Sequence, residues 1–67
     1  MKFRMFTDKK TGRKIAVNVD RVNYVMENDD GTVRIWTRRP YSNDVEVFAD
    51  VAEDFHTVIS RLNTIAE

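Results

Sequence analysis

The stretch VNYVMENDDGTVRIWT, residues 22–37, decides the fold that is predicted for this chain of 67 residues. Apolar and polar residues alternate on both sides of Asp29-Asp30-Gly31, and a period of two is typical of β-strands. Asp-Gly is a strong signal for a tight turn, because glycine adopts the positive φ that such turns require. The stretch therefore predicts an antiparallel hairpin.

Two further strands are expected before this hairpin. Residues 2–7 and 14–19 alternate in the same way, and the polar residues 8–12 between them end in glycine, which predicts a turn. Polar side chains within residues 18–21 hydrogen-bond readily to their own backbone and favour a bend. The chain thus begins with a hairpin that bends into the central one.

The end of the chain predicts a last strand and one helix. Residues 45–51 alternate again, whereas apolar residues from Phe55 onward recur every three or four positions, which is the spacing of an amphipathic helix. This stripe consists of Phe55, Val58, Ile59, Leu62, Ile65 and Ala66. Either Asp54 or Asp50 is the expected N-cap, the latter with Glu53 in an arrangement like a capping box.

The pattern as a whole predicts a single α+β domain over residues 1–67. Its expected architecture is a small antiparallel sheet of four to five strands, in the order β-β-β-β-β-α, with the C-terminal amphipathic helix packed on one face. A chain of this length buries a thin core. It has no cysteine with which to strengthen that core, so dimerisation is the remaining ordinary means.

Charge is balanced overall but distributed unevenly. The formal net charge is zero, yet residues 1–14 carry six Lys or Arg against one Asp, and residues 43–67 carry six acids against one Arg. No apolar run is long enough for a signal peptide or a membrane span. A cytoplasmic protein without membrane contact is therefore the expectation.

The residue types that support catalysis do not occur in useful patterns. His56 is the single histidine, and one histidine with scattered carboxylates does not form a zinc site. Two glycines cannot form a phosphate-binding loop, and residues 27–31 lack the spacing of a calcium loop. No catalytic residue, metal, cofactor or small-molecule substrate is predicted, and an enzyme would require a second subunit to complete a site around His56.

A binding surface is predicted instead, on the side of the sheet that the helix leaves open. If the helix covers Phe3, Met5, Ile15, Val17, Val33, Ile35, Val45 and Val47, strand alternation places another set of residues on the opposite face. That set consists of Arg4, Phe6, Arg34, Trp36, Arg38 and Phe48. Trp36 and Phe6 are the expected anchors of a partner, and Arg39 joins the arginines as a polar contact.

Three interpretations of this face stay open. The aromatic residues pack against each other or under loops of a curled sheet; or they bind a protein partner or a second copy of the chain, because interfaces favour Trp, Phe and Arg; or they stack on the bases of single-stranded nucleic acid. In the third case a basic set would assist, namely Lys9, Lys10, Arg13 and Lys14. A protein-interaction module is the favoured function, and nucleic-acid binding is the alternative.

The chain also resembles small bacterial proteins of the flagellar FlbD-like family. Residues 12–27, GRKIAVNVDRVNYVME, are similar to the family pattern G-x-x-[IF]-x-[VL]-N-x-D-x-[IV]-x-x-[IV]-x-E. Residues 31–35 and 51–58 stand where that family has its next strand and the start of its helix. Residues 38–43 replace a short Asn-Gly turn of the family. The resemblance implies a cytoplasmic, non-enzymatic, β-rich module of bacterial or phage origin, with a regulatory role through contact with another protein.

Overall fold

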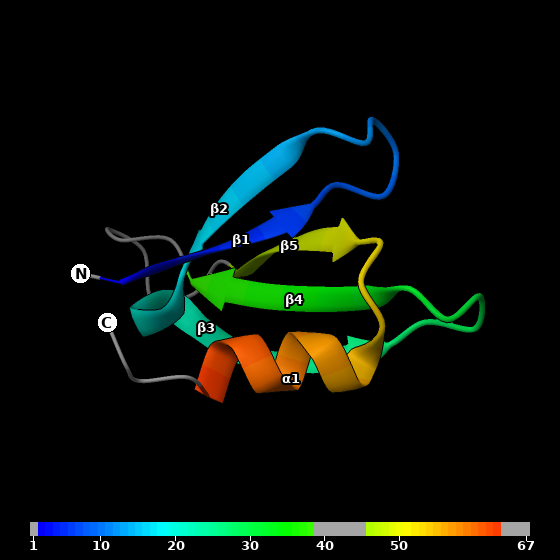
Figure 1. Cartoon of the computed structure of the whole chain (residues 1–67). Coiled ribbons are helices and arrows are strands. Elements are labelled where there is room, and N and C mark those ends of the chain that lie inside the picture. Colours follow the sequence, from blue (N-terminus) through cyan, green and yellow to red (C-terminus); the bar gives the residue numbers. More distant parts are fainter. Residues whose placement is uncertain (1, 39–45, 64–67) are drawn as a thin grey trace.

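The computed structural model describes residues 2–38 and 46–63. It confirms an α+β fold in which antiparallel strands precede a C-terminal helix (Figure 1). The elements in chain order are β1 (Phe3–Thr7), β2 (Lys14–Asn18), the 3-10 helix η1 (Val19–Arg21), β3 (Val22–Glu27), β4 (Val33–Arg38), β5 (Glu46–Val51) and α1 (Phe55–Asn63). The expected helical positions Ile65 and Ala66, and the expected strand position Val45, lie outside the described residues.

The strands form two sheets, so the expectation of one sheet of four to five strands is only partly met. β1 pairs with β2, and β3, β4 and β5 form a second sheet in that order. An isolated antiparallel bridge between Asp8 and Val51 joins them. There Ala52 N donates to Thr7 O (2.8 Å) and Lys9 N donates to Asp50 O (2.9 Å).

Beyond this bridge, side chains of the segment that includes α1 bond to the β1 edge in place of a strand. Glu53, just before the helix, accepts hydrogen bonds from Thr7 N (2.9 Å) and Thr7 Oγ1 (3.0 Å). Arg61, in the last turn, donates from Nη1 to Met5 O (2.8 Å), and Arg4 Nε donates to Arg61 O (3.2 Å). Side chains of the helix segment thus take backbone groups that a neighbouring strand would otherwise use.

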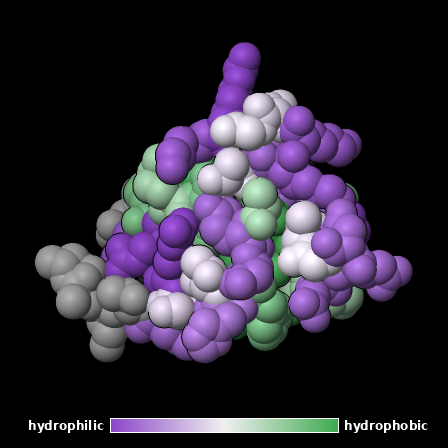
Figure 2. Space-filling view, turned by 45° about the vertical axis from the view of Figure 1, so that its right-hand side comes forward, coloured by the Kyte–Doolittle hydropathy of each residue, from purple (hydrophilic) through white to green (hydrophobic). Residues whose placement is uncertain are grey.

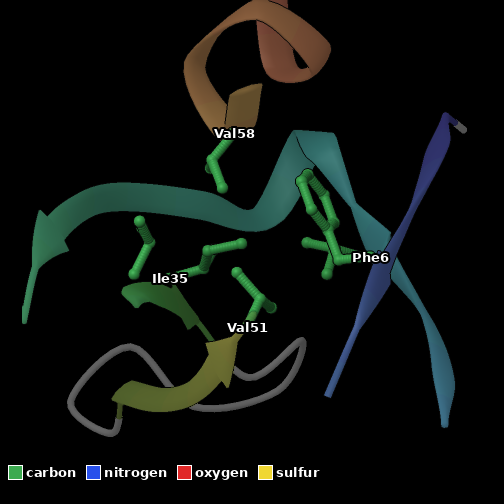
Figure 3. Packing of buried hydrophobic residues seen from close by; sticks show 6 residues of the cluster. Phe6, Ile35, Val51 and Val58 are labelled. Carbon is green, nitrogen blue, oxygen red and sulfur yellow. The ribbon is translucent and has the colours of Figure 1, made fainter. Parts of the chain in front are cut away.

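The core lies where α1 and the two sheets meet (Figure 3). The fully buried residues Phe6, Ile35, Val51 and Val58 come from β1, β4, β5 and α1, and their side chains point toward one another in Figure 3. Val33, which is also fully buried, and Val17 complete the buried cluster. Leu62 packs against it and is itself only partly buried.

The prediction of which β1 side chains face the core is wrong. Phe6 is fully buried, whereas Phe3 and Met5 are each 50% exposed. The register explains this, because Phe6 lies opposite Ile15 and Arg4 lies opposite Val17, so both belong to the inner face. Arg4 is tolerated there because its guanidinium reaches the carbonyl of Arg61 at the end of the helix.

The central turn forms as expected, but β3 does not alternate regularly. Gly31 has φ +89°, and Asn28 N donates to Thr32 O (2.8 Å). The register shifts between Val22 and Tyr24, a β-bulge that leaves one extra residue in β3. Val22 therefore packs against the core, although it is two positions from the exposed Tyr24.

Local side-chain hydrogen bonds define both helices. Asp54 is the N-cap of α1, since its Oδ1 accepts from Thr57 N (2.8 Å); the alternative Asp50 lies within β5. The expected bend after β2 is confirmed as η1, in which Asn18 Oδ1 accepts from Asp20 N (3.0 Å). These bonds satisfy backbone donors that have no partner within a helix.

Replacing Phe6 with alanine should test the corrected face of β1. We expect Phe6→Ala to lower the free energy of unfolding by about 3–5 kcal/mol, the usual cost of deleting a buried aromatic ring. Phe3→Ala, on the same strand, should cost less than about 1 kcal/mol. Urea denaturation followed by circular dichroism measures both, and equal losses would contradict the observed register.

Replacing Gly31 with valine should destabilise the central hairpin. Nothing lies within 4 Å of a Cβ built at Gly31, so the cost is conformational and should reach about 1–2 kcal/mol. Asp29→Val serves as the control, because Asp29 is in the same turn and does not have a positive φ. A Gly31→Val chain as stable as the parent would show that the turn does not need positive φ.

Candidate functional site

Three aromatic rings lie in a row across β3, β4 and β5. Tyr24 pairs with Trp36, and Trp36 pairs with Phe48. The rings of Tyr24 and Trp36 are stacked, with centroids 5.7 Å apart and planes 19° apart, and the Trp36–Phe48 centroids are 4.9 Å apart at 56°. Such offset and tilted contacts are the arrangements that aromatic rings prefer. With Met26 and Arg34 on the same side of the sheet, these rings form what we call the aromatic face.

The aromatic face is open on the side away from the core. Tyr24 is 43% exposed, Met26 53% and Phe48 48%. Trp36 is partly buried between its two neighbours. The adjacent β4 residue Ile35 is fully buried on the other side of the sheet, where α1 packs. Alternation along β4 therefore separates a covered face from an uncovered one.

The charge of Arg34 is neutralised within the face. Its Nε lies 2.8 Å from Asp50 Oδ1 and its Nη2 3.1 Å from Asp50 Oδ2, a bidentate pair. The guanidinium carbon lies 4.0 Å from the centroid of Phe48, a cation–π contact. The hydrogen bonds from Arg34 lower the pKa of Asp50, although burial opposes the shift.

A polar network extends from Asp50 to the turns of both hairpins. Asn28 Nδ2 donates to Asp50 Oδ1 (3.3 Å) and to Thr32 Oγ1 (3.1 Å). Lys9, in the first turn, forms an ion pair with Asp30 in the second (2.6 Å). This pair lowers the pKa of Asp30 and raises that of Lys9. The two turns are thereby held together at one end of the aromatic face.

Trp36 contributes a polar atom that no described residue satisfies. Its Nε1 is buried and has no hydrogen-bond partner within residues 2–38 and 46–63. A buried donor without a hydrogen-bond partner costs free energy. Trp36 is the residue of the aromatic face that carries this cost. Sequence patterns carry no signal for such a feature.

The structure brings together only part of the predicted site. Arg34, Trp36 and Phe48 share the aromatic face, and Arg38 is exposed at the end of β4. The prediction that Arg4 and Phe6 belong to this binding surface is wrong, because both lie on the inner face of the β1–β2 sheet. Arg39 lies outside the described residues.

Sequence reasoning also missed Tyr24 and Met26 as members of this face. The bulge in β3 hid them, because regular alternation groups them with Val22, which packs against the core. The cross-strand pairs Tyr24–Trp36 and Met26–Arg34 identify them once the register is known. The turn at Gly31 fixes the register of the residues next to it. Pairing β3 with β4 from that turn backward therefore places Met26 opposite Arg34 and Tyr24 opposite Trp36.

Other kinds of site find little support in the described part of the chain. His56 is exposed in the first turn of α1, and no group of three or more potential metal ligands occurs among the described residues. Within the same residues, α1 is too short and too polar to cross a membrane. Comparison with protein-family models, with curated proteins and with solved structures gives no match to the chain.

Acid should destabilise the fold. Hydrogen bonds lower the pKa of Asp8, Asp30, Asp50 and Asp54. Burial acts to raise the pKa of Glu53, but the hydrogen bonds from Thr7 and the charge of Arg61 outweigh it. A carboxylate with a lowered folded pKa stabilises the fold above its unfolded pKa, near 4, and this contribution is lost as the pH falls through the folded value.

The expected result is a free energy of unfolding that is constant above about pH 5.5 and declines below about pH 4.5. Urea denaturation between pH 2.5 and pH 7 measures it. Glu53→Gln should be less stable at neutral pH and should show a shallower decline, because one of the shifted carboxylates is gone. A chain that becomes more stable on acidification would contradict these pKa directions.

Proposed function

We propose that this protein is a non-enzymatic interaction module that binds another protein, or a second copy of itself, through the aromatic face. The observation that carries the proposal is the row of stacked rings on the uncovered side of the sheet, with Tyr24 and Phe48 nearly half exposed. Tyr, Trp, Phe, Met and Arg are the residues enriched at interfaces. A regulatory role in a bacterial cytoplasm is part of the proposal and rests on the FlbD-like resemblance.

The geometry of the rings suits a contact surface. Trp36 is fixed between its two neighbours, and Arg34 is held by Asp50 while it lies against Phe48. Side chains that are ordered before binding lose little conformational entropy when a partner arrives. The face thus presents apolar area on a rigid strand scaffold, with few side chains left to immobilise.

The charges favour protein over nucleic acid as the partner. Arg34 is paired with Asp50, and Lys9 forms a surface ion pair with Asp30, so two of the cations that phosphate groups would need already have acidic partners in the same chain. Affinity for nucleic acid comes largely from phosphate contacts. The rings could still stack on the bases of single-stranded nucleic acid without those contacts. Nucleic-acid binding is therefore the alternative function, and the experiment must distinguish it from protein binding.

A pair of matched double variants tests the proposal. Tyr24→Ser/Phe48→Ser removes the exposed rings of the aromatic face, whereas Phe3→Ser/Met5→Ser removes two equally exposed apolar residues on β1. We expect the parent chain and the β1 variant to bind the same purified partner, or to self-associate in sedimentation equilibrium. The variant of the aromatic face should bind at least about tenfold more weakly, since exposed aromatic anchors dominate interfaces.

Three outcomes contradict the proposal. The variant of the aromatic face retains full affinity; or both variants lose it equally while circular dichroism shows a native fold; or the parent chain binds mixed single-stranded oligonucleotides with an affinity that falls steeply with added salt. The last result would assign the face to nucleic acid. A contact with protein should keep its affinity in salt and change the fluorescence of Trp36.

A further inference from the structure

The β1–β2 hairpin has one edge whose backbone groups are unused. Asp8 N donates to Arg13 O, and Val19 N donates to Lys2 O, which fixes the alternation of hydrogen-bonded pairs along this ladder. By that alternation, the N–H and C=O groups of Lys14 and Ala16 point away from β1. No other group of the described residues bonds to them.

On the opposite edge of the same hairpin, both backbone groups of Thr7 and the carbonyl of Met5 have partners. Thr7 and Met5 bond to Glu53, Ala52 and Arg61, as described above. In Figure 1, β2 is the outermost strand, and no helix or strand runs along its outer side. β2 contains no proline or bulge, two of the features that block pairing at a sheet edge. Its one charged residue, Lys14, deters like-charged strands and favours an acidic one.

The surroundings of this edge are basic. Lys10, Arg13 and Lys14 are exposed, and none of them forms an ion pair with a described residue. Asp8, the one acid of the hairpin, accepts hydrogen bonds from Thr11 N and Thr11 Oγ1 (both 2.9 Å), and it interacts with the charge of Lys10 without an ion pair. The face in Figure 2 is largely hydrophilic, with hydrophobic residues in separate patches.

Apolar side chains flank the same edge on both faces of the hairpin. On the outer face, Ala16 lies opposite the half-exposed Met5. Both side chains are apolar. Ile15 packs against the core from the inner face and is only partly buried. An added strand would find apolar contacts on both of its faces.

We propose that the edge of β2 binds an extended acidic segment of another protein as an added strand. The backbone of that segment pairs with Lys14 and Ala16, its central apolar side chains lie beside Ala16 and Ile15, and its acidic residues lie beside Lys10, Arg13 and Lys14. Strand addition of this kind derives affinity from the backbone and specificity from flanking side chains. A second copy of β2 is disfavoured, because pairing two such edges brings two basic hairpins together.

A peptide of defined composition tests this inference. The probe has a Val-Thr-Val-Thr-Val centre with two glutamates at each end, and its control replaces the glutamates with lysines. Hydrogen exchange of the full chain should show slower exchange of the Lys14 and Ala16 amides with the acidic probe. The amides of Ile15 and Val17, already bonded to β1, should be unchanged.

Two variants separate backbone pairing from charge. Ala16→Pro removes an N–H that the β1–β2 ladder does not use, so the hairpin should keep its fold while the affinity for the acidic probe falls at least about tenfold. Arg13→Glu/Lys14→Glu should weaken the acidic probe and strengthen the basic control. Tyr24→Ser/Phe48→Ser should bind the acidic probe like the parent, which keeps this test independent of the aromatic face.

The inference is overturned if neither amide is protected, if both probes bind equally, or if Ala16→Pro binds like the parent while circular dichroism shows a native fold. Self-association of the parent chain that protects the Lys14 and Ala16 amides would also overturn it, because a second copy would then be the occupant of the edge.

Discussion

The structure depends on the contact between the helix segment and the free edge of β1. Glu53, just before α1, accepts a hydrogen bond from Thr7 N. Arg61, in the last turn of α1, donates one to Met5 O. A sheet edge is usually completed by another strand. Here two charged side chains bond to it beyond the point where the pairing with β5 ends, and the strands form two sheets.

That contact also decides which surfaces remain open. Because α1 lies against β1, its apolar side reaches the core through Val58, and the far side of β3, β4 and β5 is left to the aromatic rings. The aromatic face has little charge of its own to offer, since Arg34 is paired with Asp50. The basic residues are gathered on the other hairpin. Apolar and electrostatic recognition are thus located on different sheets.

The sequence predicts most of the elements but not how the sheets pack. Turn chemistry at Gly31, the bend at Asn18 and the helical spacing after Phe55 are local signals, and each is confirmed. The inner face of β1 depends on the register with β2 and on the reach of Arg4 to the end of a helix 57 residues away, neither of which is local. Alternation alone favoured Phe3 and Met5, because two apolar residues outweighed the single Phe6.

The bulge between Val22 and Tyr24 has a consequence for how this chain tolerates changes in length. One extra residue there determines which side chains of β3 face outward. Surface junctions usually accept insertions and deletions easily. At the boundary of η1 and β3, however, a single codon gained or lost would exchange tyrosine and valine between water and interior, so this short junction should be among the least variable in length within any lineage that carries the fold.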